Sequence, residues 1–117
     1  MIGLPPQTKI IFYSRPTDMR KSHNGLCGLV RNELESDPTN GTLFLFVNRR
    51  RDRNTAMYWD RDGLAIWYKR LERGTFENLK PNSDAKSIEL DQTDLALLLS
   101  GISIESAKRR KRYTKAA

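Results

Sequence analysis

The chain has 117 residues, and its 21 lysines and arginines against 14 aspartates and glutamates give a formal net charge of +7. A hydrophobic content of 38% suits one compact domain and excludes a wholly disordered chain. No apolar run approaches the roughly 20 residues that cross a bilayer, and the start lacks the basic and apolar segments of a secretory signal. We therefore expect a cytoplasmic protein without a membrane partner.

The positive charge is concentrated at the C-terminus. Residues 1–105 contain 15 basic and 14 acidic side chains, whereas residues 106–117 contain six basic and no acidic ones. A run so dense in like charges does not pack, so we predict a single domain over 1–105 and a disordered basic tail over 106–117. Phosphates are the natural partners of such a tail, and a merely solubilising end is the alternative. The candidate nucleic-acid-binding residues of the tail are Lys108, Arg109, Arg110, Lys111 and Arg112.

The N-terminal third predicts a strand followed by a helix. Residues 8–13 form a short apolar run of β-branched and aromatic side chains between two prolines, which favours a strand. Thr17 stands where an N-cap is expected, Asp18 would lie in the first turn, and apolar residues at helical spacing follow. The pattern predicts a helix over residues 17–35.

From residue 42 the hydrophobic pattern alternates, which is typical of strands. Three runs, residues 42–48, 54–59 and 64–69, are joined by connections too short for helical crossovers, so they predict an antiparallel meander. In that register one face carries Leu43, Leu45 and Val47, and the other carries Phe44 and Phe46.

The C-terminal third predicts a last strand and a short helix. A brief strand at residues 75–77 is one option, and residues 87–90 favour another. Asp91 is a plausible N-cap for a helix over residues 92–99, which Gly101 would end and Leu95, Leu98 and Leu99 would dock on the sheet. The predicted fold class is α+β: one domain, an antiparallel β-meander sheet with one longer N-terminal helix and a short C-terminal helix packed on it.

Four arginines gather in the loop between the first two meander strands. Arg49, Arg50, Arg51 and Arg53 would lie at the tip of a narrow two-stranded ribbon, where guanidinium forks can hold phosphate oxygens or contact guanine. The alternative is a solvated loop balanced by Asp52. The basic tail makes a polyanion partner the better interpretation.

Aromatic pairs stand on two neighbouring predicted strands, at Tyr58-Trp59 and Trp67-Tyr68. Such side chains can stack on the bases of single strands, but large aromatics on strands more often pack in a core. We interpret them as structural and do not include them among the binding residues.

The sequence gives little support for an enzyme. Asp60 and Asp84, the latter followed at a spacing of two by Lys86, could mimic the carboxylates of a Mg²⁺-dependent nuclease, but both are explained more simply as turn or loop residues. A lone Cys27 and a lone His23 cannot supply a closed zinc site, and no glycine-rich nucleotide loop is present. We expect no catalytic residues, no metal and no cofactor.

A series of short motifs follows in a recognisable order. They are Pro16-Thr17-Asp18-Met19-Arg20-Lys21, Gly25-Leu26, Asp37-Pro38, Gly41-Thr42-Leu43-Phe44, Asn48-Arg49-Arg50-Arg51-Asp52, Trp59-Asp60, Asp62-Gly63, Lys69-Arg70-Leu71-Glu72-Arg73-Gly74 and Leu98-Leu99-Ser100-Gly101-Ile102. With them, the chain over about residues 2–102 resembles the accessory TnpB proteins of IS-sixty-six-type bacterial insertion sequences. The resemblance implies a mobile-element protein encoded beside a larger transposase and needed for transposition, without a known active site.

Together these features give a functional hypothesis. We expect a non-catalytic accessory protein for DNA transposition that binds DNA largely without sequence preference through the arginine loop and the basic tail. Its expected partners are DNA, the cognate transposase and other accessory proteins of the element. A protein–protein adaptor that does not contact DNA is the alternative, and a Mg²⁺-dependent nuclease is a third and weaker one.

Overall fold

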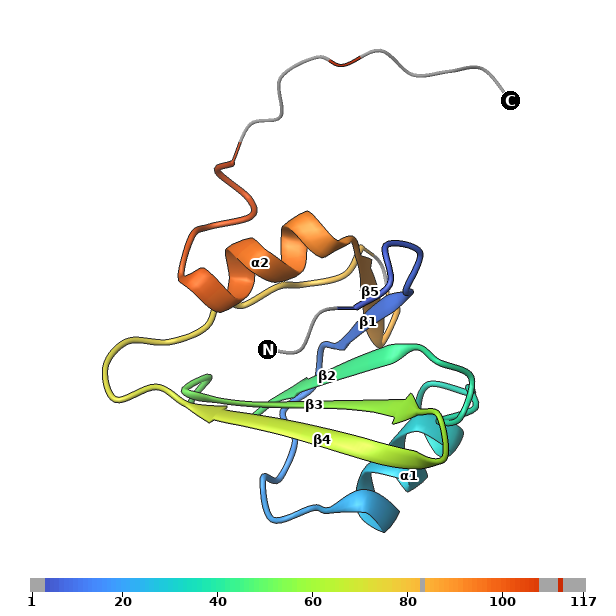
Figure 1. Ribbon diagram of the computed structural model, residues 1–117. Coiled ribbons are helices and arrows are strands. Elements are labelled where there is room, and N and C mark those ends of the chain that lie inside the picture. Colours follow the sequence, from blue (N-terminus) through green and yellow to red (C-terminus); the bar gives the residue numbers. More distant parts are fainter. Residues whose placement is uncertain (1–3, 83, 108–111, 113–117) are drawn as a thin grey trace.

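Five strands and two helices make up the computed structural model, which describes residues 4–82, 84–107 and 112 (Figure 1). In chain order they are β1 (Ile10–Tyr13), α1 (His23–Asn32), β2 (Leu43–Val47), β3 (Arg53–Asp60), β4 (Gly63–Arg70), β5 (Ser87–Leu90) and α2 (Gln92–Ser100). The expected α+β class and the expected strands β1 to β5 are confirmed.

The strands form one sheet in the order β4-β3-β2-β1-β5. β2, β3 and β4 make the predicted antiparallel meander, and β5 is antiparallel to β1. β1 and β2, however, run parallel, so the expectation of a wholly antiparallel sheet is wrong and the sheet is mixed. The reason lies in the connection: residues 14–42 include α1, and a crossover of that length can return the chain in the same direction.

The two helices cover opposite faces of the sheet (Figure 1). Every residue of β2 is buried, because its alternate side chains enter two separate cores. The core on the α2 side contains Leu43, Leu45, Val47, Leu95 and Leu98. The core on the α1 side contains Phe44, Phe46, Leu26, Cys27 and Val30. The predicted facing of β2 is confirmed, and each such side chain contributes about 1.5–3 kcal/mol when fully buried.

Helix α1 is shorter than predicted and begins later. Thr17 is not its N-cap: it is buried, and its backbone N–H donates to the carbonyl oxygen of Val47 at 2.9 Å. Asp18 accepts the backbone N–H of Arg20 at 2.9 Å, which closes a local turn instead of a helical one. The helix therefore starts at His23 after Ser22 and ends at Asn32, not at residue 35.

Helix α2 begins and ends at the signals expected from the sequence. The Asp91 side chain accepts the backbone N–H of Asp94 at 2.7 Å, and the Asp94 side chain accepts the backbone N–H of Asp91 at 3.2 Å. Gly101 follows in the left-handed conformation, at φ 78°. Leu95 and Leu98 are buried and Leu99 is partly buried against the same core.

The segment between β4 and β5 is irregular, and the strand considered at residues 75–77 is not formed. Phe76 and Leu79 instead bury their side chains in the core on the α2 side. The backbone N–H of Phe76 donates to the carbonyl oxygen of Arg51 at 2.6 Å. This segment is thereby attached to the loop between β2 and β3.

The capping box of α2 predicts a measurable loss of stability. Asp91→Ala removes the acceptor for the Asp94 N–H, so the free energy of unfolding should fall by about 1 kcal/mol. Asp91→Ser, which keeps a capping oxygen, should retain most of it. Urea denaturation followed by circular dichroism measures both, and equal stability of the Ala and Ser variants would contradict the capping role.

Candidate nucleic-acid interface

One end of the sheet carries a concentration of arginines. β1, β2 and β4 end there and β3 and β5 begin there, since Tyr13 pairs with Ser87, Val47 with Asn54, and Arg53 with Arg70. We call it the arginine end and define it by Arg15, Arg49, Arg50, Arg51, Arg53 and Arg70. The opposite end carries the acidic residues Asp60, Asp62 and Asp91.

The β2–β3 loop is shaped by one side chain, that of Asn48. Its amide oxygen accepts the backbone N–H groups of Asp52 at 3.1 Å and Arg53 at 3.0 Å, and its amide nitrogen donates to the Asp52 carboxylate at 2.7 Å. The Arg51 N–H donates to the Asn48 carbonyl at 3.0 Å, and Arg51 is left-handed at φ 59°. These bonds fix the direction in which the loop presents its cations.

The four loop arginines differ in exposure. Arg49 and Arg50 are exposed, whereas Arg51 and Arg53 are partly buried. The Nε atoms of Arg51 and Arg53 are buried and have no hydrogen-bond partner among the described residues. Arg49 and Arg50 are thus the more accessible cations, while the stems of Arg51 and Arg53 belong partly to the body of the domain.

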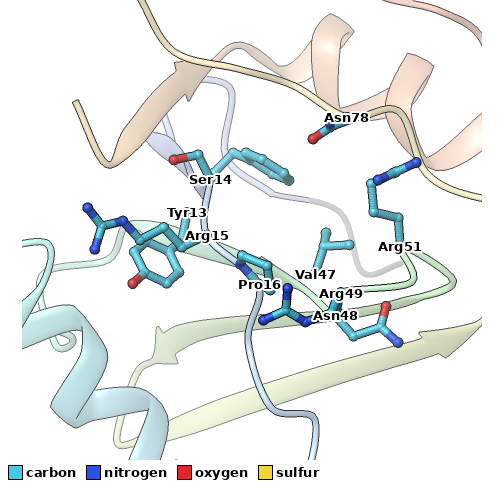
Figure 2. Close-up of a pocket in the computed structure, with 10 residues that line it drawn as sticks. Tyr13, Ser14, Arg15, Pro16, Val47, Asn48, Arg49, Arg51 and Asn78 are labelled. Atoms are coloured by element: carbon cyan, nitrogen blue, oxygen red, sulfur yellow. The ribbon is translucent and has the colours of Figure 1, made fainter. Parts of the chain in front are cut away.

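A first pocket lies where β1 and β2 end side by side. It has a volume of about 270 Å³, and Arg15, Arg49, Arg51 and Asn78 are among its lining residues. Figure 2 shows the Arg51 side chain extending toward Asn78, whereas the Arg15 guanidinium points away from Arg51. A crevice beyond the carboxyl ends of neighbouring parallel strands is a common place for ligands in open sheets.

A second pocket adjoins the first, because Asn48 and Arg49 line both. It has a volume of about 440 Å³ and lies on the α1 side of the sheet, and we call it the arginine groove. Its lining residues come from the β1–α1 loop, the β2–β3 loop and two strands: Thr17, Asp18, Met19, Arg20, Asn48, Arg49, Arg50, Arg53 and Tyr68.

The acidic side chains near the loop are engaged locally. The Arg20 guanidinium, at 2.7–3.1 Å from the Asp18 carboxylate, lowers the pKa of Asp18 to about 2. The hydrogen bond from the Asn48 amide lowers the pKa of Asp52 below its ordinary value. Both carboxylates are therefore ionised at neutral pH. Asp18 is held mainly by Arg20 and Asp52 mainly by Asn48, and the charges of Arg53 and Arg50 also help to lower the pKa of Asp52.

The segment that leads into the basic tail is attached beside the arginine loop. Glu77 accepts hydrogen bonds from the Ser103 hydroxyl and the Ile104 backbone N–H, each at 2.6 Å. Its neighbour Phe76 is bonded to Arg51, so the segment at 103–107 starts at the arginine end. Of the predicted tail residues, Lys108, Arg109, Arg110 and Lys111 lie outside the described residues, and Arg112 is exposed.

The carboxylates considered for a nuclease do not converge. Asp60 pairs with Gly63 at the end opposite the arginines, whereas Asp84 precedes β5 at the arginine end. Within residues 4–82, 84–107 and 112, no group of three or more His, Cys, Asp or Glu side chains could hold a metal ion. In the same part of the chain, no helix is long and apolar enough to cross a membrane.

Comparison with known proteins identifies the family. The family described as IS66 Orf2 like protein matches residues 8–109. The chain belongs to this family. The resemblance inferred from the motifs is thereby confirmed, and an IS66 Orf2-like protein has an accessory role in the transposition of an insertion sequence, in association with a transposase.

Two relatives of this IS66 Orf2-like protein come from Sinorhizobium fredii (strain NBRC 101917 / NGR234). The uncharacterized protein y4jC is 34% identical over 119 residues, which cover 100% of both chains. The uncharacterized protein y4hO is 32% identical over 99 residues, which cover 85% of this chain and 84% of the relative. No solved structure gives a significant match.

Three lining residues of the candidate interface were not among the predicted binding residues: Arg15 and Arg20 were not considered, and Tyr68 was considered for base stacking but interpreted as structural. They reach the arginine end through the β1–α1 loop and the end of β4. Arg20 stands in one of the motifs on which the resemblance rests, and Tyr68 belongs to an aromatic pair, so each had a signal, but nothing local joins them or Arg15 to the arginine loop. Only the tertiary arrangement brings them beside the arginine loop.

The role of Asn48 in this IS66 Orf2-like protein predicts a coupled change in stability and titration. Asn48→Ala removes the acceptor of two backbone N–H groups, so the free energy of unfolding should fall by about 1–2 kcal/mol at neutral pH. The pKa of Asp52 should rise toward its ordinary value, as NMR titration of its carboxyl carbon would measure.

The loss of unfolding free energy in Asn48→Ala should depend on pH in one direction. A folded-state pKa that is lowered stabilises the protein above the unfolded pKa, and this stabilisation is lost as the pH falls through the folded pKa. The difference in unfolding free energy between Asn48→Ala and the unaltered protein should therefore narrow below the ordinary range of aspartate. A constant difference would contradict the proposed coupling.

Glu77 predicts a pH-sensitive attachment of the tail segment. Burial raises its pKa, but hydrogen bonds from Ser103, Ile104 and Glu105 outweigh burial, so the net pKa is lowered. Protection of the Ile104 amide from hydrogen exchange should be present above the ordinary pKa of glutamate and fall below it. In Glu77→Ala this amide should exchange fast at every pH, and retained protection would refute the contact.

Proposed function

We propose that this IS66 Orf2-like protein is a non-catalytic accessory factor that binds DNA at its arginine end, largely without sequence preference, and assists the transposase. The observation that carries the proposal is that two adjoining pockets are lined by arginines from separate segments of the chain. Arg15 and Arg20 come from the β1–α1 loop, and Arg49, Arg50 and Arg53 come from the β2–β3 loop and the start of β3.

The chemistry of these side chains favours phosphate as the contacted group. Guanidinium groups donate in a planar fork that matches two phosphate oxygens, and they remain charged at any physiological pH. Contacts of this kind position a protein on DNA without reading its sequence. Affinity then arises largely from the release of counterions and falls with salt.

The basic tail can act at the same place. Its first described attachment is Ile104, beside Glu77, and Ala107 bonds back to Ile104 at 3.3 Å. A chain spans at most about 3.6 Å per residue, so Arg112 lies within roughly 18 Å of Ala107. Ser106 and Ala107, the first two residues of the predicted tail, are thus still bonded to residues 103 and 104, and the basic arm that follows them begins close enough to the arginine loop to contact the same DNA.

Salt-dependent binding tests the proposal. We expect Arg49→Gln/Arg50→Gln to bind duplex DNA more weakly and to reduce the slope of log affinity against log salt by about 2, one for each lost phosphate contact. A chain ending at Ala107 should lose affinity as well. Fluorescence anisotropy of labelled duplex at several salt concentrations measures both effects.

Arg61 supplies a matched control. It is an exposed hairpin arginine at the opposite end of the sheet. Arg61→Gln removes one positive charge, whereas the loop variant removes two, and it should leave binding nearly unchanged instead of causing half the loss. Unchanged affinity in both the loop variant and the shortened chain would refute the proposal, and capture of the transposase without DNA would then favour the adaptor.

A further inference from the structure

Tyr68 is an aromatic side chain that is not packed in either core. It is 50% exposed, whereas Tyr13, Phe44 and Phe46 on the same face of the sheet are at most 4% exposed. Its neighbour Trp67 faces the other side and packs against the α2-side core. The structural interpretation of these aromatics therefore holds for Trp67 and not for Tyr68.

The path of α1 explains this exposure. The helix starts near the first residues of β4, opposite the arginine end, where His23 Nε2 lies 3.2 Å from the Leu64 carbonyl oxygen. It ends near β1 and β5, where Glu33 contacts Lys86 at 3.0 Å. The helix thus crosses the sheet diagonally and covers Leu64 and Ile66 but not the end of β4 that carries Tyr68.

The open end of β4 is bordered by cations. Tyr68 lines the arginine groove together with Arg20, Arg49, Arg50 and Arg53. Tyr68 pairs across the strands with Thr55, and Arg53 lies two residues before Thr55 on the same face. Asp18 is the one acidic lining residue, and its carboxylate is engaged by Arg20.

A ring among guanidinium groups suits a nucleotide better than a phosphate alone. Duplex DNA presents phosphates outside while its bases stay stacked inside, so an aromatic wall would gain little from it. An unpaired base offers a π-face that stacks on tyrosine while arginines hold the adjoining phosphates. The groove volume of about 440 Å³ lies within the range usual for ligand sites.

We propose that Tyr68 stacks on an unpaired base of DNA in the arginine groove, so that the protein prefers single-stranded or frayed DNA to a closed duplex. The inference rests on the proposed function and deepens it, because it names the form of DNA that the interface takes. Arg49, Arg50 and Arg53 contact the phosphates beside that base, and Tyr68 adds the preference for unpaired DNA.

The test compares one oligonucleotide as a single strand, as a duplex and as a single strand with abasic sites. The full chain should bind the single strand more tightly than the other two. Tyr68→Thr removes the ring but keeps a residue that favours strands, and it should lower single-strand affinity by roughly 5- to 150-fold while leaving duplex affinity unchanged. Tyr68→Phe should restore the preference.

Ile102→Thr is the matched control, because Ile102 is 52% exposed and lies outside the groove lining. This variant should bind both forms of DNA like the unaltered protein. Equal affinity of the full chain for single strand and duplex, or an equal loss for both in Tyr68→Thr, overturns the inference and leaves the proposed function standing. Absence of binding to every DNA, with the transposase still captured, overturns both.

Discussion

The burial of β2 on both faces is the constraint on which the rest of the structure depends. All five residues of this strand are apolar and buried, so a helix must cover each face and a strand must pair on each side. α1 and α2 meet the first requirement, and β1 and β3 meet the second. Because β2 is enclosed on both faces and both edges, the chain after Val47 leaves the sheet at the arginine end, where it forms the β2–β3 loop.

The strands and α2 were predictable because their signals are local. Alternation along β2 assigns its faces, and Asp91 and Gly101 bound α2 through backbone bonds within a few residues. The start of α1 was not predictable in this way, because the Thr17 backbone N–H bonds to Val47, thirty residues away in the chain. The parallel pairing of β1 with β2 likewise depends on where the crossover returns, which no local pattern specifies.

The candidate site was predictable in its charge and not in its shape. The arginine loop is evident from the sequence, but its division into exposed Arg49 and Arg50 and partly buried Arg51 and Arg53 follows from packing. Arg15, Arg20 and Tyr68 join the site because the β1–α1 loop is tied to the end of β2 and α1 leaves the end of β4 uncovered. Both causes are tertiary, so the residue pattern could offer Tyr68 as a stacking side chain but could not show that it is exposed or that it lies beside these arginines.

The structure also shows how the side chains behind the formal charge of +7 are distributed over the domain. The domain over residues 1–105 has nearly equal numbers of acids and bases, and such a balance alone would not favour a polyanion. The structure distributes them unevenly: six arginines gather at one end of the sheet, although Arg70 is paired there with Glu72, and Asp60, Asp62 and Asp91 lie at the other end together with Arg61. Asp18 and Asp52, the carboxylates nearest the arginine groove, are held by Arg20 and Asn48. Arg49 and Arg50 form no ion pair with either carboxylate and their side chains are exposed, although the charge of Arg50 still acts on Asp52. A nearly neutral domain thereby has a cationic end, which is what the proposed DNA binding requires.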